Sequence, residues 1–237
     1  MTTSRRLASL AASLLFVAAC SGGEPTAPEP GGTTGELTGT FGIVAGTCAA
    51  DGTRSGSFFR MVQPGGTVAD GPFVANADSS CADKTWSPLA PGTDGGLVTG
   101  AYQSQPEPAF AGSDGAAGAI VTPTSFFAVK FAVATNDTDP QTGKLAPTPT
   151  IVAAEDGSLS GDLSAVGVAW NQQHFNQGAP KPGGEEAGLT SGPTGTYDAD
   201  TGAYTLEWAS QIVGGPFNNF TGVWRLEGTF APAAQEG

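Results

Sequence analysis

The chain has 237 residues, with 22 acidic against 9 basic residues and a formal net charge of −13. A surface this acidic repels nucleic-acid phosphates, so we expect no DNA or RNA partner. Charged residues make up only 13% of the chain, whereas Gly and Pro number 36 and 18, a composition that disfavours long helices and favours turns.

The first twenty residues have the pattern of an export signal. Two arginines precede an apolar stretch from Leu7 to Ala19, which is too short to span a bilayer as a permanent helix. The stretch runs into "VAAC", ending at Cys20, which resembles the lipobox of bacterial lipoproteins. This resemblance implies that residues 1–19 are removed and that a lipid on Cys20 anchors the exported protein to the cell membrane or outer membrane. An ordinary secretory signal with a chance cysteine is the alternative.

The next segment predicts a flexible tether. Residues 20–36 contain mainly Gly, Pro, Thr and Glu and no large apolar side chain before the end of the segment, so they cannot bury a core. Ser21, directly after the cysteine, favours the outer membrane by family analogy where the host has one. Without Arg5 and Arg6, the mature chain keeps 7 basic residues against 22 acidic ones.

The two remaining cysteines predict a disulfide. Lipidation of Cys20 leaves Cys48 and Cys81, and an exported chain meets an oxidising environment. A bridge between them would close a loop of about 33 residues and stabilise the fold by roughly 3 to 4 kcal/mol. Two free thiols are the alternative.

Short apolar segments bounded by Gly, Pro, Asn or Asp predict strands along the rest of the chain. They occupy residues 57–63, 125–133, 163–170, 203–213 and 222–230. No helical periodicity lasts for ten residues. The sequence therefore predicts an all-β fold, an antiparallel β-sandwich over residues 37–231. We expect a single domain with long Gly/Pro-rich loops, chiefly within residues 64–118, and a disordered tail at 232–237.

The C-terminal third predicts a hairpin most clearly. "DADTG" (198–202) is a turn sequence, and alternation after it places Tyr204, Leu206 and Trp208 on one face. In "GVWRLEGTF" (222–230), Trp224, Leu226 and Phe230 share a face opposite Arg225 and Glu227. The apolar faces are expected to form the core and the others to meet water.

Sequence motifs for catalysis and metal binding are sparse. There is no Gly-x-Ser-x-Gly sequence, and His174, the only histidine, has no recognisable triad partners. We expect no cofactor and no metal, since "NDTDPQTG" (136–143) and "DADTG" (198–202) match turns better than calcium loops. Glu207 and Glu227 could form a retaining glycosidase pair, but a solvated ladder with Arg225 is the favoured interpretation.

The stretch "WNQQHFNQG" (170–178) is the remaining candidate site. Alternation places Trp170 at the core end of a strand, and from Asn171 the alternation breaks into amides and an aromatic, which predicts a loop. The possible ligand-binding residues of this loop are Asn171, Gln173, His174, Phe175 and Asn176. Amides bind sugar hydroxyls and an exposed ring stacks on a sugar face, but the same side chains occur in ordinary surface loops.

Residues 170–230 resemble C-terminal portions of uncharacterised exported bacterial β-rich proteins. The resemblance rests on "WNQQHFNQG", "GTYDADTGAYTLEW" and "SQIVGGPFNNFTGVWRLEGTF" and covers about a quarter of the chain. It implies an exported β-domain and brings no activity with it.

Two functional hypotheses follow. The first is a lipid-anchored, non-catalytic cell-envelope lipoprotein with a structural role or another envelope protein as partner. The second is a glycan-binding module or weak glycan hydrolase that uses residues 171–177, with Trp86, Tyr102 or the pair Asn218 and Asn219 nearby.

Overall fold

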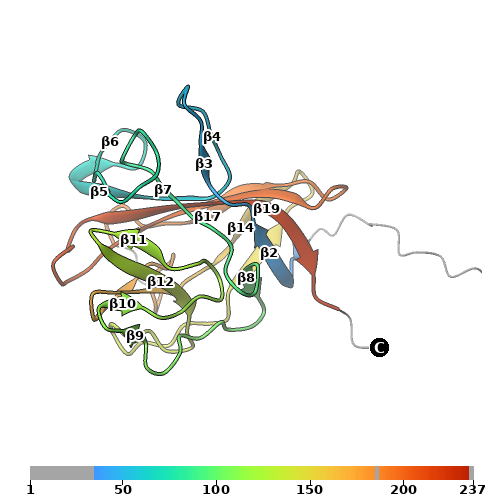
Figure 1. The fold of residues 1–237 in the computed structure, drawn as a ribbon. Helices are drawn as coiled ribbons and strands as arrows, with labels where there is room; N and C mark the ends of the chain where they lie inside the picture. Colours follow the sequence, from blue (N-terminus) through green and yellow to red (C-terminus); the bar gives the residue numbers. More distant parts are fainter. Residues whose placement is uncertain (1–34, 185–186, 235–237) are drawn as a thin grey trace, which may run out of the picture.

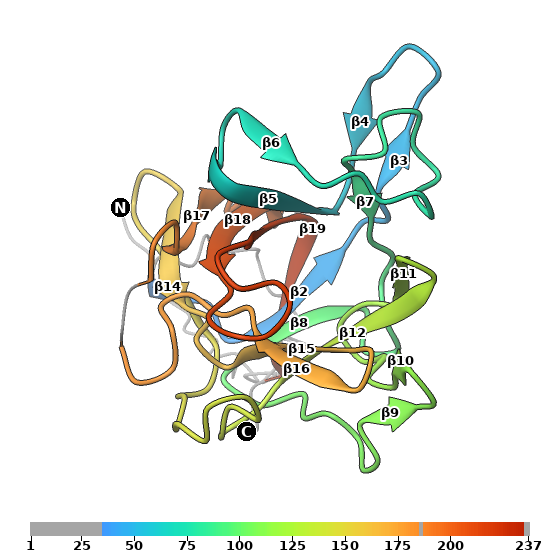
Figure 2. The same cartoon turned by 90° about the vertical axis from the view of Figure 1, so that its left-hand side faces the viewer.

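The computed structural model describes residues 35–184 and 187–234, which form an all-β fold in two layers (Figures 1 and 2). The fold class predicted from the sequence is confirmed. Within these residues no helix is long and apolar enough to cross a membrane. The predicted signal peptide (1–19), Cys20 and most of the tether lie outside the described residues.

The larger layer is a curled antiparallel sheet of eleven strands. Its main path contains, in spatial order, β1 (Gly35–Glu36), β13 (Thr150–Ala153), β14 (Ser158–Asp162), β17 (Ser191–Tyr197), β18 (Ala203–Gln211), β19 (Thr221–Pro232), β2 (Gly39–Ile43) and β8 (Gly96–Thr99). Three strands branch from it, namely β5 (Phe58–Thr67), β6 (Gly71–Phe73) and β7 (Ser87–Pro88).

The long strand β19 is the branch point of this sheet. One edge pairs with β18 along nearly its whole length, while the other edge pairs first with β5, at 221–225, and then with β2, at 228–232. Between the two partners the Glu227 main-chain N–H donates to Ser57 Oγ at 3.0 Å. A buried serine therefore satisfies the ladder group that neither strand reaches.

The smaller layer is a four-stranded antiparallel sheet of β11 (Thr124–Phe126), β12 (Val129–Thr135), β15 (Val166–Trp170) and β16 (Gln173–Asn176). It lies below the curled sheet in Figure 1, with the hairpin β9 (Phe110–Ala111) and β10 (Asp114–Gly115) beside it. Another hairpin, formed by β3 (Thr47–Cys48) and β4 (Arg54–Ser55), rises from the opposite side of the curled sheet. That side is called the outer face below.

Aromatic rings from both layers form the core. Phe59 of β5 lies 4.6 Å from Trp224 of β19 and 5.4 Å from Phe131 of β12, measured between ring centroids. All three are buried, so the sheets meet through direct ring contact. This contact closes the sandwich.

The C-terminal alternation predicted from the sequence is confirmed. The residues assigned to the core are buried, namely Tyr204, Leu206, Trp208, Trp224, Leu226 and Phe230. β17 and β18 form the hairpin around residues 198–202, with Tyr197 opposite Tyr204.

Two predicted boundaries differ from the structure. Residues 125–133 are two strands rather than one, because Phe127 and Ala128 both adopt positive φ (54° and 62°) and turn the chain between β11 and β12. The paired region also extends from Gly35 to Pro232, slightly beyond the expected 37–231, because β1 pairs with β13 and β19 continues along β2.

The predicted disulfide between Cys48 and Cys81 is present, with a Cα–Cα distance of 5.4 Å. It joins the β3–β4 hairpin to the segment that precedes β7. Each of these segments is short and has few strand hydrogen bonds of its own, so the bridge supplies the restraint that a longer ladder would give.

Replacing both cysteines (Cys48→Ala with Cys81→Ala) is expected to lower the free energy of unfolding by about 3 kcal/mol, because the unfolded chain regains the freedom of a closed loop. Urea unfolding followed by tryptophan fluorescence measures the change. Reduction of the wild type should lower stability equally. A double variant as stable as the oxidised wild type would contradict the prediction.

Candidate functional site

The segment predicted as a ligand-binding loop is a tight hairpin, and the loop interpretation is wrong for residues 173–176. They form β16, which pairs with β15 so that Trp170 faces Gln173 and Ala169 faces His174. Asn171 and Gln172 form the turn with positive φ of 49° and 58°. Two successive residues of positive φ give the turn whose twist matches a β-hairpin. Asparagine tolerates this conformation without glycine.

The side chains of this hairpin do not offer the expected sugar platform. Phe175 is only 5% exposed and Asn176 is also buried, so neither can contact a bound glycan. The half-buried His174 ring lies 5.1 Å from the Phe110 ring, between centroids, and burial lowers the pKa of His174. Of the predicted loop residues, Asn171 is exposed, and Gln173 and His174 are partly exposed.

A small apolar cavity of about 30 Å³ lies beside the hairpin, between the two layers. Phe175 and Trp170 line it together with Phe217, whose ring centroid lies 5.4 Å from that of Trp170. A cavity of this size holds about one water molecule and has no room for a sugar. At this cavity the side chains of the β15–β16 hairpin therefore pack in the core and do not form a ligand site.

Gln177 was missed as a structural residue by the sequence analysis. It is 2% exposed, its main-chain carbonyl accepts a hydrogen bond from Trp208 Nε1 at 2.8 Å, and its Oε1 accepts one from Trp224 Nε1 at 3.1 Å. The two indoles stack with centroids 5.7 Å apart. A Cβ on Gly222 would lie 1.8 Å from Gln177 Oε1, so a larger residue there would displace the Gln177 amide from its position beside Trp224. Gln177 thus satisfies both buried indole N–H groups.

Substitution Gln177→Leu is expected to lower the free energy of unfolding by about 2 kcal/mol, since it leaves the buried Trp224 N–H without an acceptor. Urea unfolding measures the loss. The matched control Gln63→Leu, at an exposed position of β5, should change stability by less than about 0.5 kcal/mol. Equal midpoints for Gln177→Leu and wild type would rule out this role.

Lys181 is a second buried polar group that the sequence did not reveal. It is 7% exposed, and its ammonium donates to the Asn176 carbonyl at 3.0 Å and to Ser210 Oγ at 2.5 Å. Ser210 in turn donates to the Gly178 carbonyl at 2.8 Å. Burial lowers the pKa of Lys181 to about 8, and the nearby Asp139 opposes this shift. The amine therefore ties the segment after β16 to β18 of the other sheet.

The lowered pKa of Lys181 predicts a stability that rises with pH. Above pH 8 the folded protein loses the proton, whereas the unfolded lysine keeps it until about pH 10.4. The unfolded state then binds more protons, so the free energy of unfolding should increase by about 2 kcal/mol between pH 8 and pH 10. Urea unfolding at several pH values measures the slope.

The variant Lys181→Met should lose this increase, and Lys130→Met, at an exposed position, should keep it. Burial also raises the pKa of Tyr197 and Tyr204, which lowers stability only above about pH 10 and acts equally in both variants. An identical slope in Lys181→Met and wild type would refute the assignment.

The two Asp-containing segments considered as calcium loops, residues 136–143 and 198–202, form turns held by their own hydrogen bonds. Asp139 accepts hydrogen bonds from the main-chain N–H and the hydroxyl of Thr142, and Asp198 accepts from the N–H groups of Asp200 and Thr201. Within the described ranges, no three side chains of His, Cys, Asp or Glu gather closely enough to hold a metal ion.

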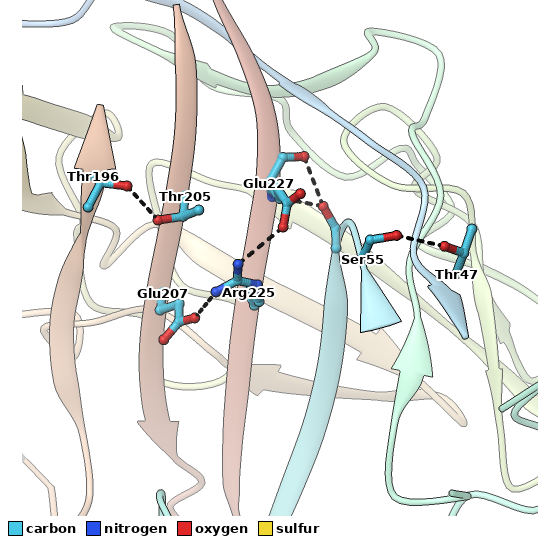
Figure 3. A network of polar contacts seen from close by, with 8 residues as sticks. Thr47, Ser55, Thr196, Thr205, Glu207, Arg225 and Glu227 are labelled. Carbon is cyan, nitrogen blue, oxygen red and sulfur yellow. Dashed lines mark hydrogen bonds and ion pairs between the residues drawn. The ribbon is translucent and has the colours of Figure 1, made fainter. Parts of the chain in front are cut away.

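On the outer face, Glu207 and Glu227 are joined by Arg225, which contacts Glu207 and lies 3.1 Å from Glu227 (Figure 3). This is the ladder favoured by the sequence. The Glu207 and Glu227 side chains are 52% and 35% exposed, so neither has the apolar surroundings that a general acid requires. Thr196 and Thr205 extend the polar row across β17 and β18 through a hydroxyl contact of 2.9 Å.

A groove lies between this polar row and the β3–β4 hairpin, and we call it the hairpin groove. Its volume is about 320 Å³, and it is lined by residues 52–56 of the hairpin, by Phe58 and Trp86, and by Glu207 and Arg225 of the sheet. The Arg54 guanidinium carbon lies 4.3 Å from the centroid of Trp86 and that of Arg60 lies 3.9 Å from it. Ser55 is held by a 2.9 Å hydroxyl contact with Thr47 (Figure 3).

The structure does not bring all the predicted glycan contacts together. Trp86 contacts the β3–β4 hairpin on the outer face, whereas residues 171–177 belong to the opposite layer. The Tyr102 hydroxyl donates to the Ala146 carbonyl at 2.7 Å. Of these candidate contacts, only the loop of Asn218 and Asn219 adjoins the β15–β16 hairpin, since Phe217 in that loop packs on Trp170 and Phe175. The two amides themselves cap that loop.

Comparison of the chain with protein-family models, with curated proteins and with solved structures finds no match.

Proposed function

We propose that the protein is a lipid-anchored lipoprotein of the bacterial cell envelope with a non-catalytic role. Support comes from the two arginines, the apolar stretch from Leu7 to Ala19 and the Cys20 at its end. The Cys48–Cys81 disulfide is the structural observation that supports export, because such bonds persist in exported proteins. The lipid on Cys20 is proposed to attach the β-sandwich to the cell membrane or the outer membrane through residues 20–36.

The polar groups of the domain support a binding role. His174 packs beside Phe110, and the two candidate carboxylates are held by Arg225. Groups arranged in this way stabilise a surface and give no matched acid and base pair. The partner in this proposal is another envelope protein or an envelope structure.

Glycan binding is the second candidate, and the hairpin groove favours it. An aromatic residue, one carboxylate, two guanidinium groups and hydroxyl groups line this concave surface, and polar groups of these kinds bind saccharides. The glycan-binding site proposed here is therefore on the outer face and not at residues 171–177, where Phe175 is buried.

Metabolic labelling with a clickable fatty acid tests the anchor. The wild type is expected to take up label and sediment with membranes, whereas Cys20→Ala should do neither, because two or more acyl chains are needed for stable attachment. Cys48→Ala is a matched control that leaves the lipidation site intact and should be labelled. Equal labelling of wild type and Cys20→Ala would end the proposal.

A further inference from the structure

We infer that the hairpin groove binds an acidic saccharide, with Arg54 receiving the carboxylate of a uronic acid unit. The inference rests on the glycan-binding candidate and specifies its site and the class of sugar. It makes no use of the lipid anchor.

The Arg54 guanidinium is positioned to bind an anion. Its guanidinium lies over Trp86, and its Nη1 donates to the Gly52 carbonyl at 3.2 Å. No carboxylate among the described residues lies within ion-pair distance of it. Stacking on an indole holds the planar group in place and leaves N–H donors at its edge for a carboxylate.

The charge around the groove is unusual for this chain. All three arginines of the described residues, Arg54, Arg60 and Arg225, gather here, although the chain as a whole carries −13. Glu207 and Glu227 neutralise Arg225, and the single carboxylate of Asp83 interacts with both Arg54 and Arg60. The three arginines and the three carboxylates balance, so the groove is close to neutral on an otherwise acidic chain. Of the two arginines that line it, Arg225 is held by glutamates and Arg54 has no carboxylate of the described residues within ion-pair distance. The Arg54 guanidinium can therefore receive the anionic group of a ligand.

The other groups of the groove favour a saccharide over a simple anion. Glu207 has a half-exposed carboxylate that can accept hydrogen bonds from ligand hydroxyl groups, and the Ser55 hydroxyl can bind a further one. A ligand that carries both a carboxylate and hydroxyl groups uses Arg54 and Glu207 together, as a uronic acid does. The volume of about 320 Å³ lies within the range of small-molecule sites.

The disulfide fixes the geometry of the groove. Cys48 begins the hairpin wall and Cys81 lies in the segment that carries Trp86, so the bridge joins the two walls. Arg225 is held between two glutamates on the floor. Groups that are already positioned lose little freedom on binding.

Calorimetric titration of the full chain in detergent tests the inference with trigalacturonate and with galactotriose, the same rings without carboxylates. The wild type is expected to bind trigalacturonate at least about tenfold more tightly than galactotriose. Arg54→Gln should weaken trigalacturonate binding about tenfold or more, and Arg54→Lys should weaken it less. Raising the salt concentration should weaken binding to the wild type.

Lys130→Gln is the matched control, since it removes one positive charge from an exposed position in the other layer. It should bind as the wild type does, and thermal unfolding should show that the Arg54 variants are folded. Equal binding of both trisaccharides, unchanged binding by Arg54→Gln, or equal losses in Lys130→Gln would overturn the inference.

Retention of the protein on peptidoglycan and on polysaccharide beads distinguishes failure of the acidic-saccharide inference from failure of the glycan-binding candidate. Retention that Arg54→Gln leaves unchanged would overturn the inference and leave the glycan-binding candidate standing. Absence of binding to both trisaccharides and of retention on every glycan support would end both.

Discussion

The contacts of Gln177 hold the two layers of this protein in register. The residue follows β16 of the smaller sheet, and it accepts hydrogen bonds from Trp208 and Trp224 on adjacent strands of the larger sheet. An indole N–H buried without an acceptor would weaken the core, so the stacked pair depends on an amide delivered from the opposite layer. Lys181 adds a second tie from the same segment to Ser210 of β18.

One edge of β19 pairs first with β5 and then with β2, and this division creates the groove on the outer face of the sheet. The chain leaves this edge after β2 and returns at Ser57, and the β3–β4 hairpin is formed in between. The hairpin stands over the polar row of β18 and β19, and the disulfide joins it to the segment of Trp86. The hairpin groove is therefore a consequence of sheet branching.

Much of the fold was predictable where alternation is regular. In β18 and β19 large apolar side chains alternate with polar ones over much of each strand, and the apolar ones form the core: Tyr204, Leu206, Trp208, Trp224, Leu226 and Phe230. Prediction failed at the β15–β16 hairpin because Gln173, His174 and Asn176 have little strand propensity, and the pairing with β15 overrides that preference. It also failed at residues 125–133, where a turn without glycine separates two strands.

The sequence by itself determined the all-β class, the cysteine pair and the candidate export signal, because these follow from local composition, alternation and cysteine number. Only the tertiary structure decided the use of the polar residues. Gln177 and Lys181 became buried ties, His174 packed beside Phe110, and Arg54 met Trp86 on the outer face. Polar side chains act through partners that are distant in the chain, and only folding brings those partners within hydrogen-bond distance.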